Sequence, residues 1–425
     1  MRQAEGLCGG RITPEELDEL SARHPQGNFQ ETSHMMELAR RHGSEVEAVG
    51  VRRGGTLVAG CFVAYGTGRL GTTGSIWCGP LCDLHDRELA AALTGAIRDS
   101  AKAHHAVSVS CWPDFVYQLH DSEGTPVGEP DQASFDTLAD LGWEHGGFQV
   151  GYATVCHRWV YVKDLTGIGS EQELLDSYAK YRRRNIRIAR ESYVGVRPMG
   201  RDEMGLFQRL CDMSSEKQGF EGRGAAYYED LFDVFGDDVQ FRVAEIDLAR
   251  YRAHWEEKLA HDRASVAATE ARIAQGRANP KAAKHLEALR AEVDGAERRL
   301  TEADELIARD GELVPIGCIC YLYHEREVVG LSAGNDERYA RFYASALLHH
   351  LIMVDAVARG IGRYNFYGIS GIFDKDDPSY GVYEFKTRFN GYVEEMPGEF
   401  TLPVDPLRHG AKRLAGRLLG RLGRA

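Results

Sequence analysis

The residues that could do chemistry gather near the end of the chain, in YNFYGISGIFDKDDPSYGVYEFKTRFNGYVEE at positions 364–395. This stretch surrounds Lys386 with five tyrosines and four phenylalanines. A lysine held in place could supply a fixed positive charge that stabilises negative charge developing on a reacting carbonyl group. The simpler interpretation is a surface lysine that pairs with Glu384 or Asp377. Residue types alone leave both interpretations open.

A second candidate region is the block KYRRRNIRIAR at positions 180–190, which is almost purely positive. The whole chain has a net charge of −13, so its surface as a whole is unsuited to non-specific nucleic-acid binding. A nucleic-acid partner would therefore need a local basic patch such as this one. The alternative is an ordinary solvated helix face.

The nine cysteines show no spacing typical of a metal site. Cys318 and Cys320 lie in the alternating apolar run VPIGCICYLY, which predicts strand residues rather than metal ligands. Scattered free thiols suit a reducing cytosol. The first residues lack an apolar stretch of signal-peptide length, and no segment approaches the ~18 apolar residues of a membrane-spanning helix. We therefore expect a cytoplasmic protein without a metal site.

The elements that must position these residues follow a doubled order of helices and strands. Thr13 and Glu16 predict a capping box at the start of a helix over 13–24, and Gly54 lies in a predicted hairpin turn. A second series contains one long basic helix over 170–193, a hairpin around 324–327, a helix over 342–362 and a strand over 363–368. Two mixed α/β units of about 150 residues each fit this order.

An insert at 246–311 interrupts the second unit. Its second half repeats apolar residues in a heptad pattern, with one position occupied by Leu286, Val293, Leu300 and Ile307 and another by Leu289, Ala296 and Ala303. Leu259, Val266 and Ile273 form a weaker repeat in the first half. We expect two antiparallel helices of about 28 residues that project roughly 40 Å, joined by a turn at 275–281. The pattern leaves open a dimerisation arm, a decoration or a contact arm for a large partner.

The final segment 403–425 is basic and carries leucines at helical spacing. A basic amphipathic helix of this kind suits peripheral contact with an anionic membrane surface. A disordered tail and an RNA-binding tail are the alternatives.

Several motifs together carry a resemblance to a known family. The stretch YNFYGISG…YGVYEFKTRFNGYVEE is similar to the C-terminal signature of the Fem family, the aminoacyl-tRNA-dependent transferases that build peptidoglycan interpeptide bridges. The opening segment ITPEELDELSARHPQGNFQETSHMMELARRHG, the helix YRRRNIRIARESYVGV and the segment KQGFEGRGAAYYEDL also resemble that family, in the same order. The match covers about residues 10–402.

The resemblance implies an α/β fold with two tandem acetyltransferase-like (GNAT-like) domains and an inserted antiparallel coiled-coil arm. The first domain would span 1–155 and be completed by about 390–402. The second would comprise 156–245 and 312–390, with the arm at 246–311 and the basic tail at 403–425.

The implied reaction transfers an amino acid from aminoacyl-tRNA to the side-chain amine of the third stem residue of a peptidoglycan precursor. The acceptor would be lipid II or the soluble UDP-MurNAc-pentapeptide. Aminoacyl-tRNA would act as a co-substrate, with no further cofactor. Because exchanging an ester for an amide is downhill, the enzyme mainly needs positioning, loss of one proton and stabilisation of an oxyanion.

By resemblance, Lys386 matches the lysine of an E-F-K motif and would be the catalytic cation. We expect it on a strand, with Tyr383 and Phe385 pointing to the opposite face. The family motifs also assign Phe385 to the substrate site. After the strand that ends near Cys111, the family often has Asp-Pro where this chain has CWPDFVY, so Asp114 as a general base is one option and substrate groups are another.

Further substrate-binding residues carried over are Arg223, Tyr227 and Tyr343. Arg223 and Tyr227 are four residues apart and would share a face, and the arginine could fork onto a diphosphate or carboxylate. Arg41, or its neighbour Arg40, takes the place of another basic substrate-binding residue. For the basic helix, the proposed tRNA donor gives a reason to expect phosphate contact by Arg183, Arg184 and Arg187. Arg183 and Asn185 match the family pattern, and the alternative is that these two residues hold the two domains together.

Three other functions remain to be weighed. An acyl-CoA N-acetyltransferase needs a glycine-rich pyrophosphate loop, and NDERYARFYASALL at 335–348 has none. A non-catalytic coiled-coil scaffold would leave the aromatic and basic segments unexplained. A Fem-like enzyme that modifies a secondary metabolite from charged tRNA is compatible with the sequence.

Overall fold

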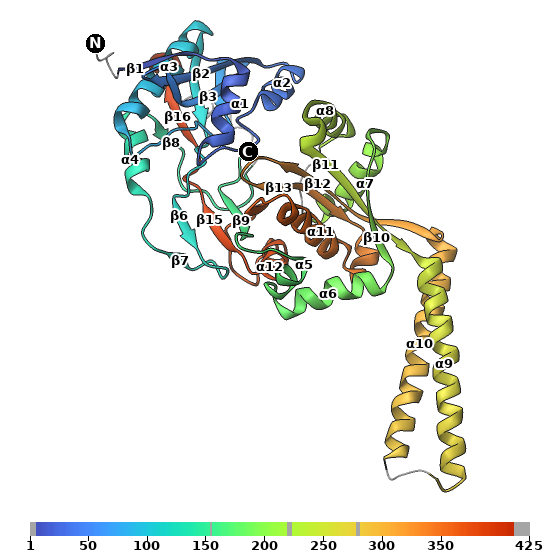
Figure 1. Cartoon of the computed structure of the whole chain (residues 1–425). Coiled ribbons are helices and arrows are strands. Elements are labelled where there is room, and N and C mark those ends of the chain that lie inside the picture. Colours follow the sequence, from blue (N-terminus) through green and yellow to red (C-terminus); the bar gives the residue numbers. More distant parts are fainter. Residues whose placement is uncertain (1–5, 154, 219–222, 278–280, 412–425) are drawn as a thin grey trace, which may run out of the picture.

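The computed structural model describes residues 6–153, 155–218, 223–277 and 281–411, and consists of two sheets with flanking helices and a projecting helical arm (Figure 1). Two predictions concern residues outside this part of the chain: most of the basic tail, at 412–425, and part of the turn at the tip of the arm. Among the described helices, none combines the length and apolar character that crossing a bilayer requires.

The first sheet has seven strands in the order β1-β2-β3-β4-β5-β16-β8. Its neighbouring strands are antiparallel except for the parallel pair β4–β5. The strands are β1 (Leu7–Arg11), β2 (Glu45–Arg53), β3 (Thr56–Gly68), β4 (Gly71–Ile76), β5 (Ala106–Cys111), β8 (Glu144–His145) and β16 (Phe400–Pro403). The accompanying helices are α1 (Pro14–Arg23), α2 (Ser33–Arg41), α3 (Arg87–Ala103) and α4 (Gln132–Asp140).

The second sheet has nine strands in the order β10-β11-β12-β13-β14-β9-β15-β6-β7, with the parallel pair β13–β14. The strands are β6 (Gln118–His120), β7 (Pro126–Val127), β9 (Trp159–Asp164), β10 (Val194–Pro198), β11 (Val239–Asp247), β12 (Leu313–Tyr323), β13 (Val328–Asn335), β14 (Arg363–Gly368) and β15 (Tyr392–Glu395). The α-helices are α5 (Glu171–Asp176), α6 (Lys180–Glu191), α7 (Met204–Gln218), α8 (Ala225–Phe235), α11 (Ala344–Ala358) and α12 (Tyr380–Thr387). Short 3-10 helices are η1 (Arg201–Glu203), η2 (Gly236–Asp238) and η3 (Glu337–Phe342).

The two units repeat one order of elements, which confirms the doubled α/β architecture predicted from the sequence. Each has a strand, two helices, three antiparallel strands, a helix and a strand that returns parallel to the third of them: β1-α1-α2-β2-β3-β4-α3-β5 in one and β10-α7-α8-β11-β12-β13-α11-β14 in the other. The predicted capping box is present, since Thr13 Oγ1 accepts from Glu16 N while Glu16 accepts from Thr13 N.

The units exchange strands. β6 and β7, which follow the first unit's β5 along the chain, pair at the edge of the second sheet, where β15 joins β6 to β9. β16 returns to the first sheet between β5 and β8. Of the predicted completing segment 390–402, residues 392–395 therefore belong to the second sheet, and β16 adds residues 400–403 to the first. Helices α2 and α8 pack together where the two units meet. Nearby, the rings of Phe29 and Phe235 lie edge to face, with their centroids 6.3 Å apart.

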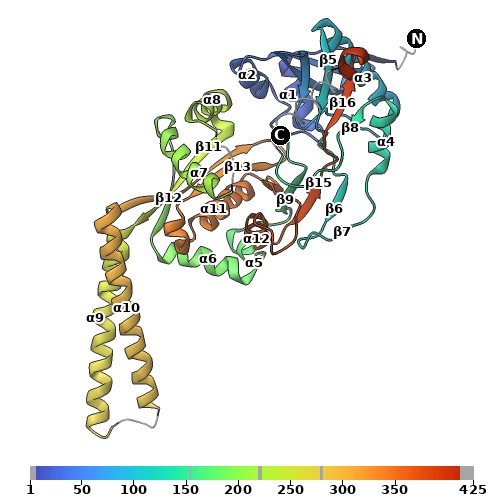
Figure 2. The same ribbon diagram turned by 180° about the vertical axis from the view of Figure 1, so that it is seen from behind.

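The predicted arm is present as α9 (Leu248–Ala274) and α10 (Ala282–Asp310), which run antiparallel and project from the β11–β12 hairpin in both views (Figures 1 and 2). The heptad positions of α10 are buried or half-buried between exposed neighbours, as the seam predicts. On α9 the prediction is wrong at its last position, because Ile273 is 38% exposed. The two helices of the arm thus pack more closely near the α/β units than near the tip of the arm.

Two predictions about helices were wrong. The expected single helix over 170–193 is broken at residues 177–179, because Ala179 N and Ser177 O bond to Arg388 O and Asn390 Nδ2 instead of continuing the helix. Lys386 lies on helix α12 and not on a strand, so Tyr383 and Phe385 do not share an opposite face. Tyr383 is buried and donates to Ser122 O at 2.6 Å.

Candidate active site

Strand β14 ends in a bulge that exposes two adjacent carbonyl groups. The register with β9 shifts between Asn365 and Gly368. Tyr367, within the shift, adopts a positive φ of 64°, and its N–H donates to Asn365 Oδ1 at 2.8 Å. A non-glycine residue in this conformation costs free energy and is concentrated at functional sites. The bulge turns the carbonyl groups of Tyr367 and Gly368 toward helix α12.

Lys386 fills the space between α12 and this bulge. Its Nζ donates to Tyr367 O at 3.2 Å and to Gly368 O at 2.6 Å, and the residue is only 7% exposed. Burial lowers the pKa of Lys386 to about 7, because a charged amine loses its hydration there. Near neutral pH the amine is thus divided between its charged and neutral forms.

The surface-lysine interpretation of Lys386 is wrong. Glu384 pairs with Arg388 at 2.6 Å, and Asp377 accepts from Ser379. In the part of the chain that the structure describes, no carboxylate pairs with Lys386. Among the described residues its positive charge is therefore balanced by carbonyl groups rather than by a carboxylate. The catalytic role itself stays a prediction.

His157 closes the other side of the bulge. Its ring stands perpendicular to that of Tyr367 at 4.5 Å, and a Cβ on Gly368 would come within 2.4 Å of His157 Nδ1. Burial, then the positive charges of Lys386 and Arg223, lower the pKa of His157 to about 4, so the imidazole is neutral at pH 7. No motif drew attention to His157, because its role in the packing depends on a contact across the fold.

Arg223 and Tyr227 meet as the sequence predicted. Arg223 precedes helix α8, and its guanidinium lies 4.3 Å from the centroid of the Tyr227 ring. Burial raises the pKa of Tyr227, which keeps the phenol neutral. The charge of Arg223 also acts on His157 and Tyr367, so this pair faces the same region as Lys386. Binding of substrate by these two residues stays a prediction.

Arg41 occupies a different position, at the end of α2 against α8. Its guanidinium pairs with Glu37 and Asp230, each at 3.5 Å, so neighbouring carboxylates already balance its charge. Arg40 pairs with Glu37 at 3.7 Å. The structure does not bring Arg41 together with Lys386, and its substrate role stays a prediction.

Asp114 lies in the seam between the units. Asn28 Nδ2 donates to it at 3.3 Å. Burial, and then the negative charge of Glu327, raise the pKa of Asp114 to about 8. The carboxyl group is therefore mainly protonated at pH 7, which disfavours it as a general base at that pH.

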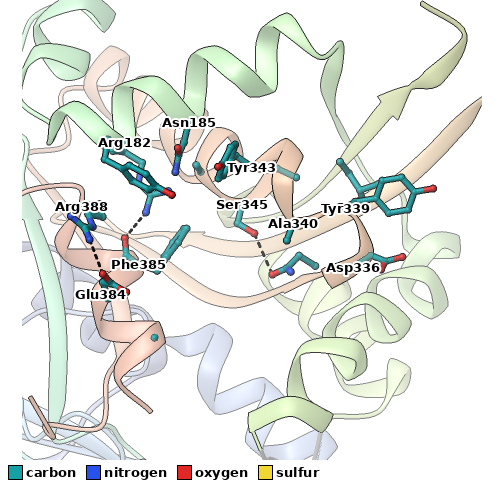
Figure 3. A pocket seen from close by; sticks show the side chains of 16 residues that line it. Arg182, Asn185, Asp336, Tyr339, Ala340, Tyr343, Ser345, Glu384, Phe385 and Arg388 are labelled. Atoms are coloured by element: carbon teal, nitrogen blue, oxygen red, sulfur yellow. Dashed lines mark hydrogen bonds and ion pairs between the residues drawn. The ribbon is translucent and has the colours of Figure 1, made fainter. Parts of the chain in front are cut away.

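A pocket of about 330 Å³ opens between α6, the start of α11 and α12 (Figure 3). Tyr343 and Phe385, two of the predicted substrate residues, both line it. Tyr343 is the N-cap of α11 in a left-handed conformation, with a φ of 54°. The predicted residues thus form two groups, one around Lys386 and one in this pocket, with α12 contributing to both.

Arg182 is a pocket residue that the sequence interpretation missed. It is 2% exposed, donates from Nη2 to Phe385 O at 2.6 Å, and lies 4.2 Å from the centroid of the Phe385 ring. Burial lowers its pKa to about 10, so it remains charged at neutral pH. Helical periodicity could have found it, because Arg182 lies four residues before Ile186 and seven before Ala189, both on the buried face.

The outer face of α6 carries the arginines predicted to contact tRNA. Arg183, Arg184 and Arg187 are all exposed. Arg183 pairs with Asp176 at 3.3 Å and Arg187 with Glu191 at 3.7 Å, whereas Arg184 forms no ion pair with any described residue. Arg184 also acts electrostatically on Tyr343, which places its charge near the pocket. The tRNA role stays a prediction.

Comparison with known proteins identifies the family. The model of the FemAB family matches residues 12–417, so this chain belongs to that family. It is 29% identical over 345 residues to the aminoacyltransferase FemB of Staphylococcus epidermidis, covering 81% of this chain and 82% of that protein. It is 26% identical over 413 residues to the aminoacyltransferase FemA of the same species, covering 96% and 98%.

The fold agrees with this assignment. The crystal structure of FemX superposes with a TM-score of 0.75 at 20% identity, covering 95% of this chain and 99% of FemX. The family model confirms the Fem-family resemblance predicted from the sequence, and the likeness to FemX confirms the predicted fold. The enzyme class predicted from the sequence, an aminoacyltransferase, is the one named in both staphylococcal relatives.

Proposed function

We propose that this protein transfers an amino acid from aminoacyl-tRNA to the amine of the third stem residue of a peptidoglycan precursor. The single observation that carries the chemistry is Lys386, a buried amine that donates to two carbonyl groups of the β14 bulge and has no carboxylate partner among the described residues. The names of the FemA and FemB relatives support the reaction class.

The reaction is an aminolysis of an ester. The acceptor nitrogen attacks the aminoacyl carbonyl carbon, and the negative charge moves to the carbonyl oxygen. The carbon–oxygen bond to the tRNA ribose then breaks, and the ribose oxygen takes up the proton that the nitrogen loses. The products are an amide and a free ribose hydroxyl, so no oxidant or reductant enters the balance. In its protonated form, Lys386 would stabilise the oxyanion, and no cofactor beyond the charged tRNA is proposed.

The acceptor is proposed to be lipid II or UDP-MurNAc-pentapeptide. Both carry a diphosphate, and the guanidinium of Arg223 could fork onto phosphate or carboxylate oxygens beside Tyr227. The exposed arginines at 183, 184 and 187 would contact the tRNA backbone. Such a reaction belongs at the cytoplasmic face of the membrane, with peripheral contact through 403–425 as part of the proposal.

The test is a transfer assay with lipid II or the UDP-linked pentapeptide and total tRNA charged with radiolabelled amino acids. We expect label on the muropeptide that RNase abolishes and that Lys386→Ala reduces about 100- to 1,000-fold. Lys375→Ala, which changes an exposed lysine of the same segment, is the matched control. Transfer that ignores Lys386→Ala would remove the catalytic assignment. Failure with every charged tRNA and both acceptors would overturn the acceptor proposal and favour a secondary metabolite.

A further inference from the structure

We propose that His157 is a positioning residue for Lys386. Its imidazole ring holds the bulge of β14 in the shape that turns two carbonyl groups onto the lysine amine and keeps water away from that amine. This inference rests on the proposed function for the catalytic role of Lys386, although it can be tested without the transfer reaction. Among the described residues, His157 forms no hydrogen bond with Lys386, so it acts through the bulge.

The ring of His157 lies face-on against Gly368. A Cβ added to Gly368 would come no more than 2.6 Å from three ring atoms, Nδ1, Cγ and Cε1, at nearly equal distances. Only a residue without a side chain therefore lets the ring lie so close to the backbone. Gly368 O is also the nearer of the two acceptors of Lys386 Nζ, at 2.6 Å. The ring thus packs on the backbone unit that binds the lysine most closely.

The same ring supports the second carbonyl group through Tyr367. The two rings stand at 89° with their centroids 4.5 Å apart, an edge-to-face arrangement that stabilises aromatic pairs. Tyr367 has a positive φ of 64°, which a bulky residue keeps only where its surroundings hold it. Its N–H bond to Asn365 Oδ1 and the ring of His157 both support this conformation. Because Tyr367 O accepts from Lys386 Nζ at 3.2 Å, releasing Tyr367 would weaken that contact as well.

The chain fixes His157 just before β9. Arg158 O accepts from Met396 N at 2.6 Å, and the guanidinium of Arg158 pairs with Glu395. Arg158 Nη1 also donates to Gln149 O at 3.0 Å. The strand that follows pairs with both β14 and β15. The imidazole therefore projects from an anchored segment, as a side chain that shapes a neighbouring strand must.

The imidazole acts by packing rather than by charge. Burial, and then the positive charges of Lys386 and Arg223, lower the pKa of His157 to about 4, whereas the pKa of Lys386 is about 7. The ring is therefore neutral throughout the range in which the lysine changes its charge. Its Nδ1 is buried and forms no hydrogen bond with any described residue. A neutral ring in this place excludes water from the bulge, and loss of hydration is what lowers the pKa of Lys386.

The first test measures the titration of Lys386 in the whole protein by competitive labelling with trace acetic anhydride and peptide mass spectrometry. The wild-type amine should gain reactivity with a midpoint near pH 7. In His157→Ala, water would reach the amine, so the midpoint should rise by about one pH unit or more toward the ordinary lysine value of about 10.4. In His157→Phe, which keeps a flat ring, the midpoint should stay near that of the wild type.

The matched control is His145→Ala. His145 also packs among aromatic rings, with its centroid 4.9 Å from that of Phe400, and bonds to Pro397 O at 2.9 Å, but it belongs to the first sheet. Its removal should leave the midpoint of Lys386 unchanged. Thermal unfolding shows which variants fold, and His157→Leu, which also lacks the flat ring, replaces His157→Ala if that variant does not fold. An unchanged midpoint in the folded variant at position 157, or an equal shift in His145→Ala, would overturn the inference.

A second test uses the fit between the ring and Gly368. Gly368→Ala would push the ring and the bulge apart, so we expect kcat for transfer to fall about 100-fold with little change in KM, as for a small misplacement of a catalytic group. Adding His157→Ala removes the clash, so the double variant should transfer faster than Gly368→Ala alone. Independent sites would multiply their losses instead. Multiplied losses would show that the contact between His157 and Gly368 does not position the lysine.

The two tests separate this inference from the proposed function. If the wild-type protein transfers no amino acid from any charged tRNA, the proposed function fails, and a raised Lys386 midpoint in His157→Ala still supports the positioning role. If transfer depends on Lys386 while folded His157→Ala keeps the wild-type midpoint, the positioning role fails and the proposed function stands.

Discussion

The two α/β units share one order of elements, but their equivalent helices α3 and α11 differ in how their N-termini are capped. In the first unit, Asp86 caps α3 by accepting from Leu89 N at 3.0 Å, and it also pairs with Arg53 at 2.5 Å. In the second unit, Tyr343 takes the cap position without a side-chain hydrogen bond, and the first turn faces a pocket. Of these two helices, only α11 therefore begins without a side-chain cap.

The two units also differ in how far their parallel strands, β4–β5 and β13–β14, stay paired. β4 and β5 stay paired over five register positions, from Thr72 opposite Ala106 to Ile76 opposite Cys111. β13 and β14 pair at two positions only, Val328 with Tyr364 and Val329 with Asn365. Beyond them β14 bulges and presents its carbonyl groups to Lys386. The two parallel strands of the first unit are thus paired along more of their length. In the second unit they separate at the place where chemistry is proposed.

The largest expected effect concerns Lys386 and its pH dependence. Below about pH 7 the lysine is charged, and kcat/KM should rise about tenfold per pH unit as the acceptor amine, with a lysine-like pKa of about 10.4, loses its proton. Above about pH 7, Lys386 loses its charge in the same proportion, so the profile should level. Lys386→Arg keeps its charge, so its profile should continue to rise. A wild-type profile that rises unbroken to pH 9 would show that the cation is not required.

A smaller effect is expected at Arg182 of the second unit, a buried cation without a carboxylate partner among the described residues. Arg182→Met should lower transfer about tenfold, because the hydrogen bond to Phe385 O, which holds the part of α12 beside Lys386, is lost. It should lower the free energy of unfolding by no more than about 1 kcal/mol, because an unpaired buried charge is removed.

The matched control is Arg158→Met. Arg158 is also buried but pairs with Glu395, which additionally accepts from His120 at 2.7 Å. Removing it would leave a largely buried carboxylate without its main partner, so unfolding by denaturant should show a loss of about 3 kcal/mol or more. Equal losses for the two variants would refute the distinction between paired and unpaired arginines.

The closed helix terminus can be tested with Asp86→Ala. Loss of the cap should cost about 1 kcal/mol in the free energy of unfolding. Transfer should stay unchanged, because α3 lies in the unit without the proposed catalytic lysine. Slower transfer by this variant would contradict the separation of roles between the two units.

The smallest effect is expected from shortening the arm, which replaces the short β2–β3 turn of the first unit. Removing residues 264–296 and joining the ends by a short glycine-rich turn leaves Leu248, Tyr251 and Leu306 packed at the base. The lost contacts include exposed ion pairs such as Arg290 with Glu270 at 2.6 Å, which contribute little. We expect the free energy of unfolding of the body to change by less than about 1 kcal/mol. A loss of several kcal/mol would mean that the distal arm is part of the folding unit.

Local patterns in the sequence were sufficient for the features that depend on neighbours along the chain. The capping box of Thr13 and Glu16 needs residues three apart, and the seam of α10 needs a repeat of seven. The heptad pattern failed at Ile273, where α9 approaches its end and a weak repeat no longer finds a partner surface. The ordered motifs also sufficed for the family and hence for the doubled unit.

The environment of the candidate site was decided by the tertiary structure. Lys386 owes its lowered pKa to its burial between α12 and the bulge of β14. His157 packs on the same bulge from the segment just before β9. Arg182 and Asn185 belong to a basic stretch that reads as a solvated or RNA-binding face. They are buried because α6 lies against α11 and α12. Spacing along a chain sets which side chains share a face, whereas burial, charge pairing and pKa depend on which other elements cover that face.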